Sequence, residues 1–293
     1  MTRSLRNRLP DPLRRQWLTA SALACLGVRA QAQELTDLDK VRASGVLKVA
    51  VYKDNAPYSD GTAQNLRGVD VALAQALADT MGLKLSLLPF DAGERMDDDL
   101  RNMVWKGHYL GYGPADVMLH VPVDKFLIRE TPQSLIFGPY SREVLVVFHA
   151  LDKLPGLKSG DDLQDLPLAA ERGSGAAGTL LGYGGGRLRS KLTTYPTGVQ
   201  AAEAVIRGEA AAAYLSRAQA EAALHASGRS VSGFGLTQLT LPGLSDNGWP
   251  IGMAVKASHK MLAQALETAL GQVRQSGKLL AIYRERGLTL VAP

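Results

Sequence analysis

The five histidines are the side chains of this sequence best suited to metal binding or proton transfer. No two of them show the His-x-x-x-His spacing of a helical zinc site. His108 and His120 could approach Asp116 or the acidic run at 97–99, but such residues more often cap helices or lie on the surface. We therefore predict neither a metal nor another cofactor. The five are His108, His120, His149, His225 and His259.

Catalysis would require a carboxylate acting as a general acid in a cleft, and Glu171 is the best candidate. The run Gly184-Gly185-Gly186 lacks the Lys-Ser/Thr pair of a phosphate-binding loop, so a flexible surface loop explains it better. No catalytic constellation emerges, and we predict that the chain is not an enzyme.

A Gly-x-Gly pattern, Gly173-Ser174-Gly175, follows Glu171 and Arg172 directly. If a helix begins there, the free amides of residues 174–176 could bind an anion, with Arg172 as a nearby cation. A plain strand-to-helix turn explains the pattern equally well.

The charge of the chain depends on its first 32 residues. They hold six of the 33 basic and one of the 28 acidic residues, so the remainder carries 27 of each and a formal charge of zero. This balance removes the electrostatic case for a nucleic-acid partner. The only cysteine, Cys25, also lies there, so the remainder has neither disulfides nor thiolate metal sites.

Residues 1–32 read as a cleavable signal peptide, with five arginines before an apolar run at 17–28 and the small-residue pattern Ala30-Gln-Ala32. The apolar run is too short to cross ~30 Å of hydrocarbon as a permanent anchor. Arg14-Arg15 also fits a twin-arginine signal, which leaves the export route open, and the residues before Cys25 do not fit a lipoprotein. We predict export to the periplasm with cleavage near Ala32.

Strands and helices alternate along the remainder, which predicts an α/β fold with parallel sheets. The 46% hydrophobic content suffices for one large core or two modest ones. The last segment is too short for a domain and should return to the first lobe. We predict lobe 1 over 33–143, lobe 2 over 144–249, and a return to lobe 1 over 250–293, with a hinge at two crossings near 142–147 and 248–255.

The expected strands are 46–51, 84–90, 115–121, 142–149, 168–170, 210–215 and 249–256. The expected helices are 69–80, 97–106, 197–207, 216–226 and 258–277, the last capped by Ser258.

The order and spacing of several short segments resemble the periplasmic binding proteins of the polar amino-acid type (solute-binding protein family 3), the receptors of ABC importers. The segments are Leu47–Val51 with Pro57-Tyr58, Gly68–Ala74, Ala115–Val117, Phe137–Tyr140 and Ile251–Lys256. The resemblance implies a bilobal type II fold, two α/β lobes joined by a two-strand hinge, that closes on a small polar solute in the interlobe cleft.

The resemblance also implies ligand-binding positions, from which this sequence partly departs. Asp124 replaces a threonine, Arg129 is one residue out of step with the family's carboxylate-binding arginine, and Ser216 replaces the aspartate that binds the ligand's ammonium. A neutral hydroxyl is a poor substitute for that carboxylate. The full set of predicted ligand-binding residues is Tyr58, Asp60, His120, Pro122, Asp124, Arg129, Tyr140, Arg172, Gly173, Ser174 and Ser216.

These departures, with the runs 98–108 and 115–122, are similar to a branch of the family associated with quinoprotein (PQQ-dependent) methanol and alcohol dehydrogenases. We therefore expect a non-catalytic accessory of such a dehydrogenase, or a binder of a small polar ligand. The alternative is the substrate receptor of an ABC importer for an amino acid or related solute, with an ABC permease as partner. Neither interpretation involves nucleic acid or a membrane-embedded mature chain.

Overall fold

The computed structural model describes residues 35–62, 64–244 and 248–293. The predicted signal peptide lies outside these residues. Residues 36–293 form one compact unit that contains two five-stranded sheets. Within the described residues, no helix is both long and apolar enough to span a bilayer.

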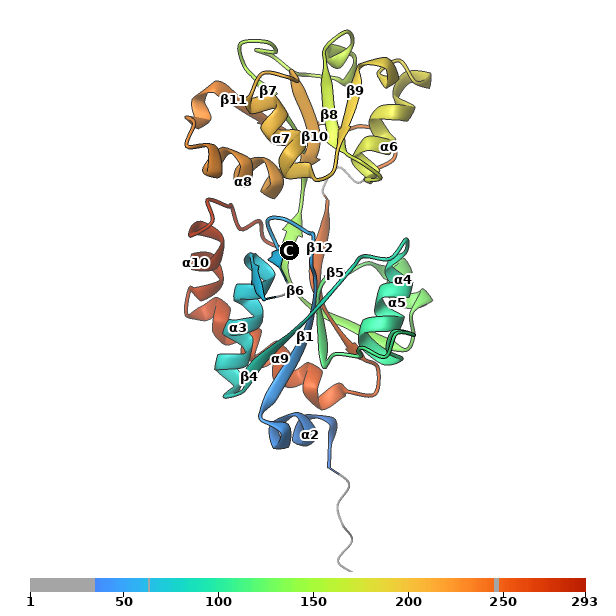
Figure 1. Ribbon diagram of the computed structural model, residues 1–293, viewed down its shortest axis with the longest axis vertical. Coiled ribbons are helices and arrows are strands. Elements are labelled where there is room, and N and C mark those ends of the chain that lie inside the picture. The colour runs from blue at the N-terminus through green and yellow to red at the C-terminus, as the bar shows by residue number, and fades with distance from the viewer. Residues whose placement is uncertain (1–34, 63, 245–247) are drawn as a thin grey trace, which may run out of the picture. The chain divides into compact units, whose positions relative to one another are not determined.

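The first sheet has the strand order β4-β1-β5-β12-β6 (Figure 1). Strand β1 (Val46–Tyr52) pairs in parallel with β4 (Lys84–Phe90) and β5 (Val117–Pro122). Strand β12 (Trp249–Lys256) then pairs antiparallel with both β5 and β6 (Ser134–Glu143). A small hairpin of β2 (Asp60–Thr62) and β3 (Asn65–Arg67) follows β1.

Helices cover both faces of this sheet because its strands are apolar on both sides. Leu47, Val49 and Val51 pack toward α2 (Asp37–Ser44), α3 (Val69–Met81), α9 (Lys260–Gln275) and α10 (Lys278–Arg284). Ala50 and Tyr52 belong to the core on the opposite face, beneath α4 (Met96–Leu100) and the π-helical turn η2 (Arg101–Trp105). Helix α5 (Lys125–Glu130) packs beside α4.

The second sheet repeats the arrangement of the first, in the order β9-β8-β10-β7-β11. Its parallel strands are β8 (Leu168–Glu171), β9 (Leu192–Tyr195) and β10 (Ala212–Ser216), while β7 (Leu145–Ala150) is antiparallel to β10 and to β11 (Phe234–Thr237). One core includes residues of α7 (Gly198–Ile206) and α8 (Arg217–Ser227). The other includes α6 (Gly175–Gly182).

The chain passes from the first sheet to the second between Glu143 and Leu145 and has returned when β12 begins at Trp249. The expected single strand at 142–149 is therefore wrong: it is two strands broken at Val144, because β6 and β7 belong to different sheets. Trp249 lies opposite Glu143 in the β12–β6 ladder. Gly248, at φ 62°, is so close to the Glu143 carbonyl that a side chain could not be accommodated.

Two expected helices differ from the structure. The helix expected at 97–106 becomes α4 and the π-helical η2, with the η2 residues Met103 and Val104 buried against the sheet. Ser258 does not cap α9. The helix begins at Lys260, so the cap position is His259, whose side chain forms no capping hydrogen bond. The Asp37 carboxylate of α2 instead accepts a hydrogen bond from the Leu262 amide at 2.8 Å, because α2 packs against this end of α9.

Candidate functional site

A cavity of about 410 Å³ lies at the carboxyl ends of parallel strands from both sheets. This is where α/β sheets usually bind ligands, and the volume is typical of small-molecule pockets. The first-sheet region contributes Tyr52, Asp54, Asn55, Tyr58, Asp91, Ala92, Met96, His120, Pro122, Glu143, Trp249 and Ile251. The second contributes Leu145, Glu171, Ser174, Gly175, Ala176, Tyr214, Leu215, Ser216, Gln219 and Leu244.

His120, near the end of β5, is fixed on one side of the cavity by two buried residues. Its Nδ1 lies 3.0 Å from Oδ2 of Asp70, which is 1% exposed. The Tyr140 hydroxyl donates to the other Asp70 oxygen at 2.7 Å and accepts from the His120 amide at 3.0 Å. Burial would lower the pKa of His120, but the Asp70 carboxylate raises it, and the net pKa is above its ordinary value. The Asp70 carboxylate thus favours the imidazolium form of His120.

Glu143 is a buried carboxylate at the point where the chain leaves the first sheet. It is 7% exposed, and the hydroxyl side chains of Tyr58 and Ser216 are its polar neighbours. Burial raises its pKa above 4.5, while His120 and hydrogen bonding to these two hydroxyls oppose that rise. The centre of the Tyr58 ring lies 4.3 Å from that of the His120 ring, with the ring planes tilted by 48°, so these residues form one connected group.

The second sheet contributes two helix N-termini and a second carboxylate. Ser174 caps α6 and Ser216 caps α8, each accepting from the amide three residues on. Glu171 Oε2 accepts from the Gly198 amide at 3.0 Å and from Gln219 Nε2 at 2.9 Å. Glu171 is therefore a hydrogen-bond acceptor in this structure, whereas a general acid must donate a proton to its substrate.

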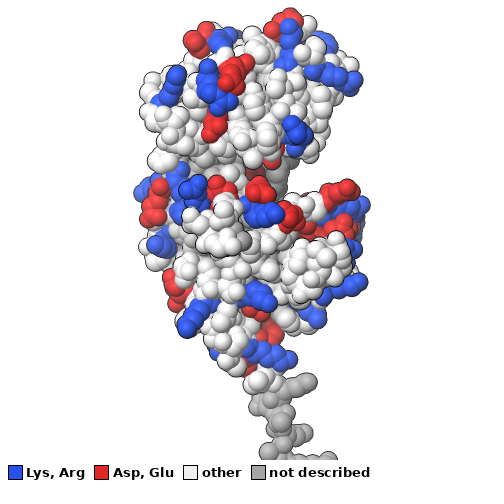
Figure 2. All heavy atoms as spheres, viewed as in Figure 1, with Lys and Arg blue, Asp and Glu red and all other residues white. Residues whose placement is uncertain are grey.

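The cavity lining is acidic. Four carboxylates line it, from Asp54, Asp91, Glu143 and Glu171, and no lysine or arginine of the described chain is among the lining residues. Asp91 pairs at 2.7 Å with Lys53, a half-buried residue outside the lining. The face of the protein seen in Figure 2 otherwise carries basic and acidic side chains intermixed.

The structure brings five of the predicted ligand-binding residues to this cavity and leaves six outside its lining. Those in the lining are Tyr58, His120, Pro122, Ser174 and Ser216. Those outside it are Asp60, Asp124, Arg129, Tyr140, Arg172 and Gly173.

The residues outside the lining have other partners. Asp124 caps α5 by accepting from two amides, and the exposed Arg129 lies over the Phe126 ring at 5.2 Å. Asp60 pairs with Arg67 at 3.7 Å, and Tyr140 supports Asp70 from behind the cavity. Arg172 is exposed, so neither arginine considered as a carboxylate ligand reaches the site.

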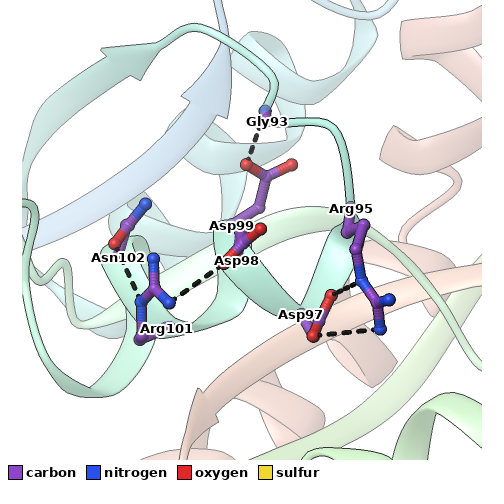
Figure 3. A network of polar contacts seen from close by, with 7 residues as sticks. All are labelled: Gly93, Arg95, Asp97, Asp98, Asp99, Arg101 and Asn102. Carbon is purple, nitrogen blue, oxygen red and sulfur yellow. Dashed lines mark hydrogen bonds and ion pairs between the residues drawn. The ribbon is translucent and has the colours of Figure 1, made fainter.

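The acidic run at 97–99 does not form a metal site, because each carboxylate has a separate partner (Figure 3). Asp97 pairs with Arg95 at 2.9 Å and Asp98 with Arg101 at 3.0 Å. Asp99 turns inward to accept from the Gly93 amide at 2.8 Å and from Tyr52 at 2.9 Å. Among the described residues, no group of three histidine, cysteine or acidic side chains could hold a metal ion.

Sequence reasoning missed Glu143 and Asp70 as site residues. Asp70 lies in the first turn of the helix expected at 69–80, where an acidic residue is explained by the helix dipole alone. Glu143 is the sole acidic residue of β6 and lies in the apolar run 142–149 that the sequence predicts as a strand. An acidic residue within an apolar strand was the available signal.

Comparisons with known proteins show which fold this chain shares. No family model matches the chain. The cyclohexadienyl dehydratase of Pseudomonas aeruginosa is 45% identical over 73 residues, only 23% of this chain and 27% of that protein. An ancestral cationic amino acid solute-binding protein matches 86% of this chain and all of its own, with a TM-score of 0.65 and 18% identity. An arginine-bound amino acid ABC transporter substrate-binding protein from Streptococcus pneumoniae matches 87% of this chain and all of its own, with a TM-score of 0.59 and 18% identity.

These structural matches establish the fold. The predicted bilobal type II periplasmic-binding fold, with its two α/β lobes, is confirmed. Below 25% identity such matches carry no ligand or partner over to this chain.

Proposed function

We propose that this chain is a non-catalytic, exported solute-binding protein that holds a small solute in the 410 Å³ cavity and serves as the substrate receptor of an ABC importer. The observation that carries the proposal is the cavity itself, which lies at the strand ends of both lobes, where one solute touches both. A solute bound there stabilises the form of the protein in which both lobes contact it. The similar folds belong to proteins described as solute-binding and substrate-binding proteins.

A receptor role in ABC import of a small solute is the better supported of the two functions expected from the sequence. The structurally similar proteins carry amino-acid-binding descriptions, and nothing in them supports a quinoprotein dehydrogenase partner. The accessory role remains a prediction that depends on the altered positions Asp124, Arg129 and Ser216 and on the resemblance of the runs 98–108 and 115–122.

The proposal is tested by screening cationic, zwitterionic, neutral and anionic solutes for a rise in melting temperature. Confirmation comes from the fluorescence of Trp249, which lines the cavity. The variant Leu145→Trp fills the cavity from β7 and should abolish binding. Val231→Trp, at a 69% exposed position outside the lining, is the matched control and should bind normally. If no solute binds, or if Leu145→Trp binds as the wild type does, the cavity is not a solute site.

An enzymatic function is the second candidate, favoured by the 73-residue match to a dehydratase and by the raised pKa of Glu143. Mass spectrometry of each bound solute after prolonged incubation distinguishes the two. Recovery of the solute unchanged supports a binding protein, whereas a product lacking one water supports a dehydratase.

A further inference from the structure

The buried charges on the His120 side of the cavity do not balance. Asp70, 1% exposed, and Glu143, 7% exposed, are two acidic side chains, and His120 is the one basic side chain that acts on both. With all three groups ionised, one negative charge is left over. A buried charge without an opposite charge is costly, and here no lysine or arginine of the described residues lines the cavity to provide one.

The excess charge is at Glu143 rather than Asp70. His120 Nδ1 contacts Asp70 at 3.0 Å, and the Tyr140 hydroxyl satisfies the other Asp70 oxygen. Glu143 forms no ion pair with a described residue, its polar neighbours besides His120 are the hydroxyls of Tyr58 and Ser216, and it lines the cavity whereas Asp70 does not. Ser216 is the position where the family resemblance implied a carboxylate for the ligand's ammonium. The Ser216 hydroxyl instead contacts a carboxylate that comes from the end of β6.

We propose that the cavity binds a small organic amine without a carboxylate, and that Glu143 is the counter-ion of its ammonium group. This inference depends on the proposed solute-binding function and names the solute class. Tyr52, Tyr58, Tyr214 and Trp249 add aromatic surface to the lining, which suits a cation with an apolar body. A ligand carboxylate would find only the N-terminal end of α6, equivalent to about half a charge, beside the Glu171 carboxylate.

The test compares amines with the amino acids from which they differ by one carboxylate. Isothermal titration of the full chain at pH 7 would use agmatine against L-arginine and cadaverine against L-lysine. We expect at least one amine to bind about tenfold more tightly, or better, than its amino acid. An amino acid that binds more tightly than its amine would overturn the inference.

The variant Glu143→Gln keeps an acceptor for Tyr58 and Ser216 but removes the charge. It should weaken amine binding by about 30-fold or more, since loss of one member of a buried charge pair is that costly. Glu267→Gln, at an exposed position on α9 outside the lining, should change affinity by less than about twofold. Equal amine affinity in wild type and Glu143→Gln would refute the role of Glu143.

Folding does not confound the comparison. Because burial raises the pKa of Glu143, the neutral glutamine should leave the free energy of unfolding at pH 7 unchanged or higher. Urea denaturation checks this point. If neutral or anionic solutes bind and Leu145→Trp blocks them while no amine binds, the amine inference fails and the solute-binding function stands. If nothing binds, the function itself fails.

Discussion

His120 has a left-handed backbone conformation, with φ 60°, within β5. For a residue with a side chain this conformation costs about 1–2 kcal/mol, so its surroundings must stabilise it. They do so from two directions, through the amide bond to Tyr140 and the ring contact with Asp70. The conformation directs the imidazole toward Tyr58 and the cavity. One strained residue thereby connects the buried aspartate to the site.

The charge of His120 is expected to depend on Asp70. In Asp70→Asn, burial would lower the pKa of His120 with little opposition, and we expect a value below 6.5 by NMR titration of the imidazole. His149 is the internal control, because burial already lowers its pKa and it bonds to Leu154 and Thr237 instead. An unchanged His120 pKa in Asp70→Asn would show that Asp70 is not the cause.

The same pair gives the protein a pH-dependent stability. The folded pKa of His120 is raised above 6.5, so its contribution is complete below pH 6.5 and is lost as pH rises through the folded value. Wild type should therefore lose more of its unfolding free energy than Asp70→Asn over that interval. Glu143 on β6 and Tyr58 also face the imidazole, and Tyr140 accepts from the His120 backbone amide, so the comparison between variants matters more than either curve alone.

At the scale of elements, local patterns predicted the type of most segments but not the contacts between them. The periodic apolar residues of α3 and the buried runs of β1 and β5 suffice to identify those elements. The cap of α9 comes from Asp37, far away in sequence, and no pattern near Ser258 reveals it. Glu143 was missed for the same reason, since Tyr58 and Ser216 meet it only in the folded chain. The cavity residues that were predicted came from the family resemblance, not from periodicity.

The cap of α9 is tested by two alanine substitutions. Asp37→Ala removes the acceptor of the Leu262 amide and should lower the unfolding free energy by about 0.5–2 kcal/mol, the usual range for a lost cap. Ser258→Ala, which the sequence alone would rank as the more damaging change, should stay within about 0.5 kcal/mol. Urea denaturation of both variants measures these losses. A larger loss of unfolding free energy in Ser258→Ala than in Asp37→Ala would show that Ser258 caps the helix after all.

At the scale of the whole molecule, the C-terminal segment after α10 forms a contact between elements of the two lobes. Thr289 donates from its amide and hydroxyl to Glu221 of α8, at 2.7 and 2.8 Å. The Arg142 amide of β6 donates to the Val291 carbonyl at 3.0 Å. Val291 packs against the core that includes α7 and α8, and Leu288 against the core that includes α3 and α9. The last residues therefore connect the lobes in addition to the two strand crossings.

Glu221 is the residue through which this connection is tested. Glu221→Ala leaves Thr289 and Arg217 without their acceptor, and should cost about 2–3 kcal/mol of unfolding free energy. Glu203→Ala, which removes an exposed i,i+4 pair with Arg207, should cost about 0.5 kcal/mol or less. Similar losses in both variants would mean that the C-terminal segment contributes little.

The close approach of Gly248 to Glu143 bears on how such a chain could have been assembled. The second lobe leaves β6 and rejoins β12 at two residues that face each other across a β-ladder, so its two ends are neighbours. A segment with adjoining ends can be grafted into a host protein without separating the host's own strands. By that geometry the second lobe has the form of an insertion in the first, joined to it at one place, and its sheet has the same alternation of parallel and antiparallel neighbours as the sheet of the first lobe.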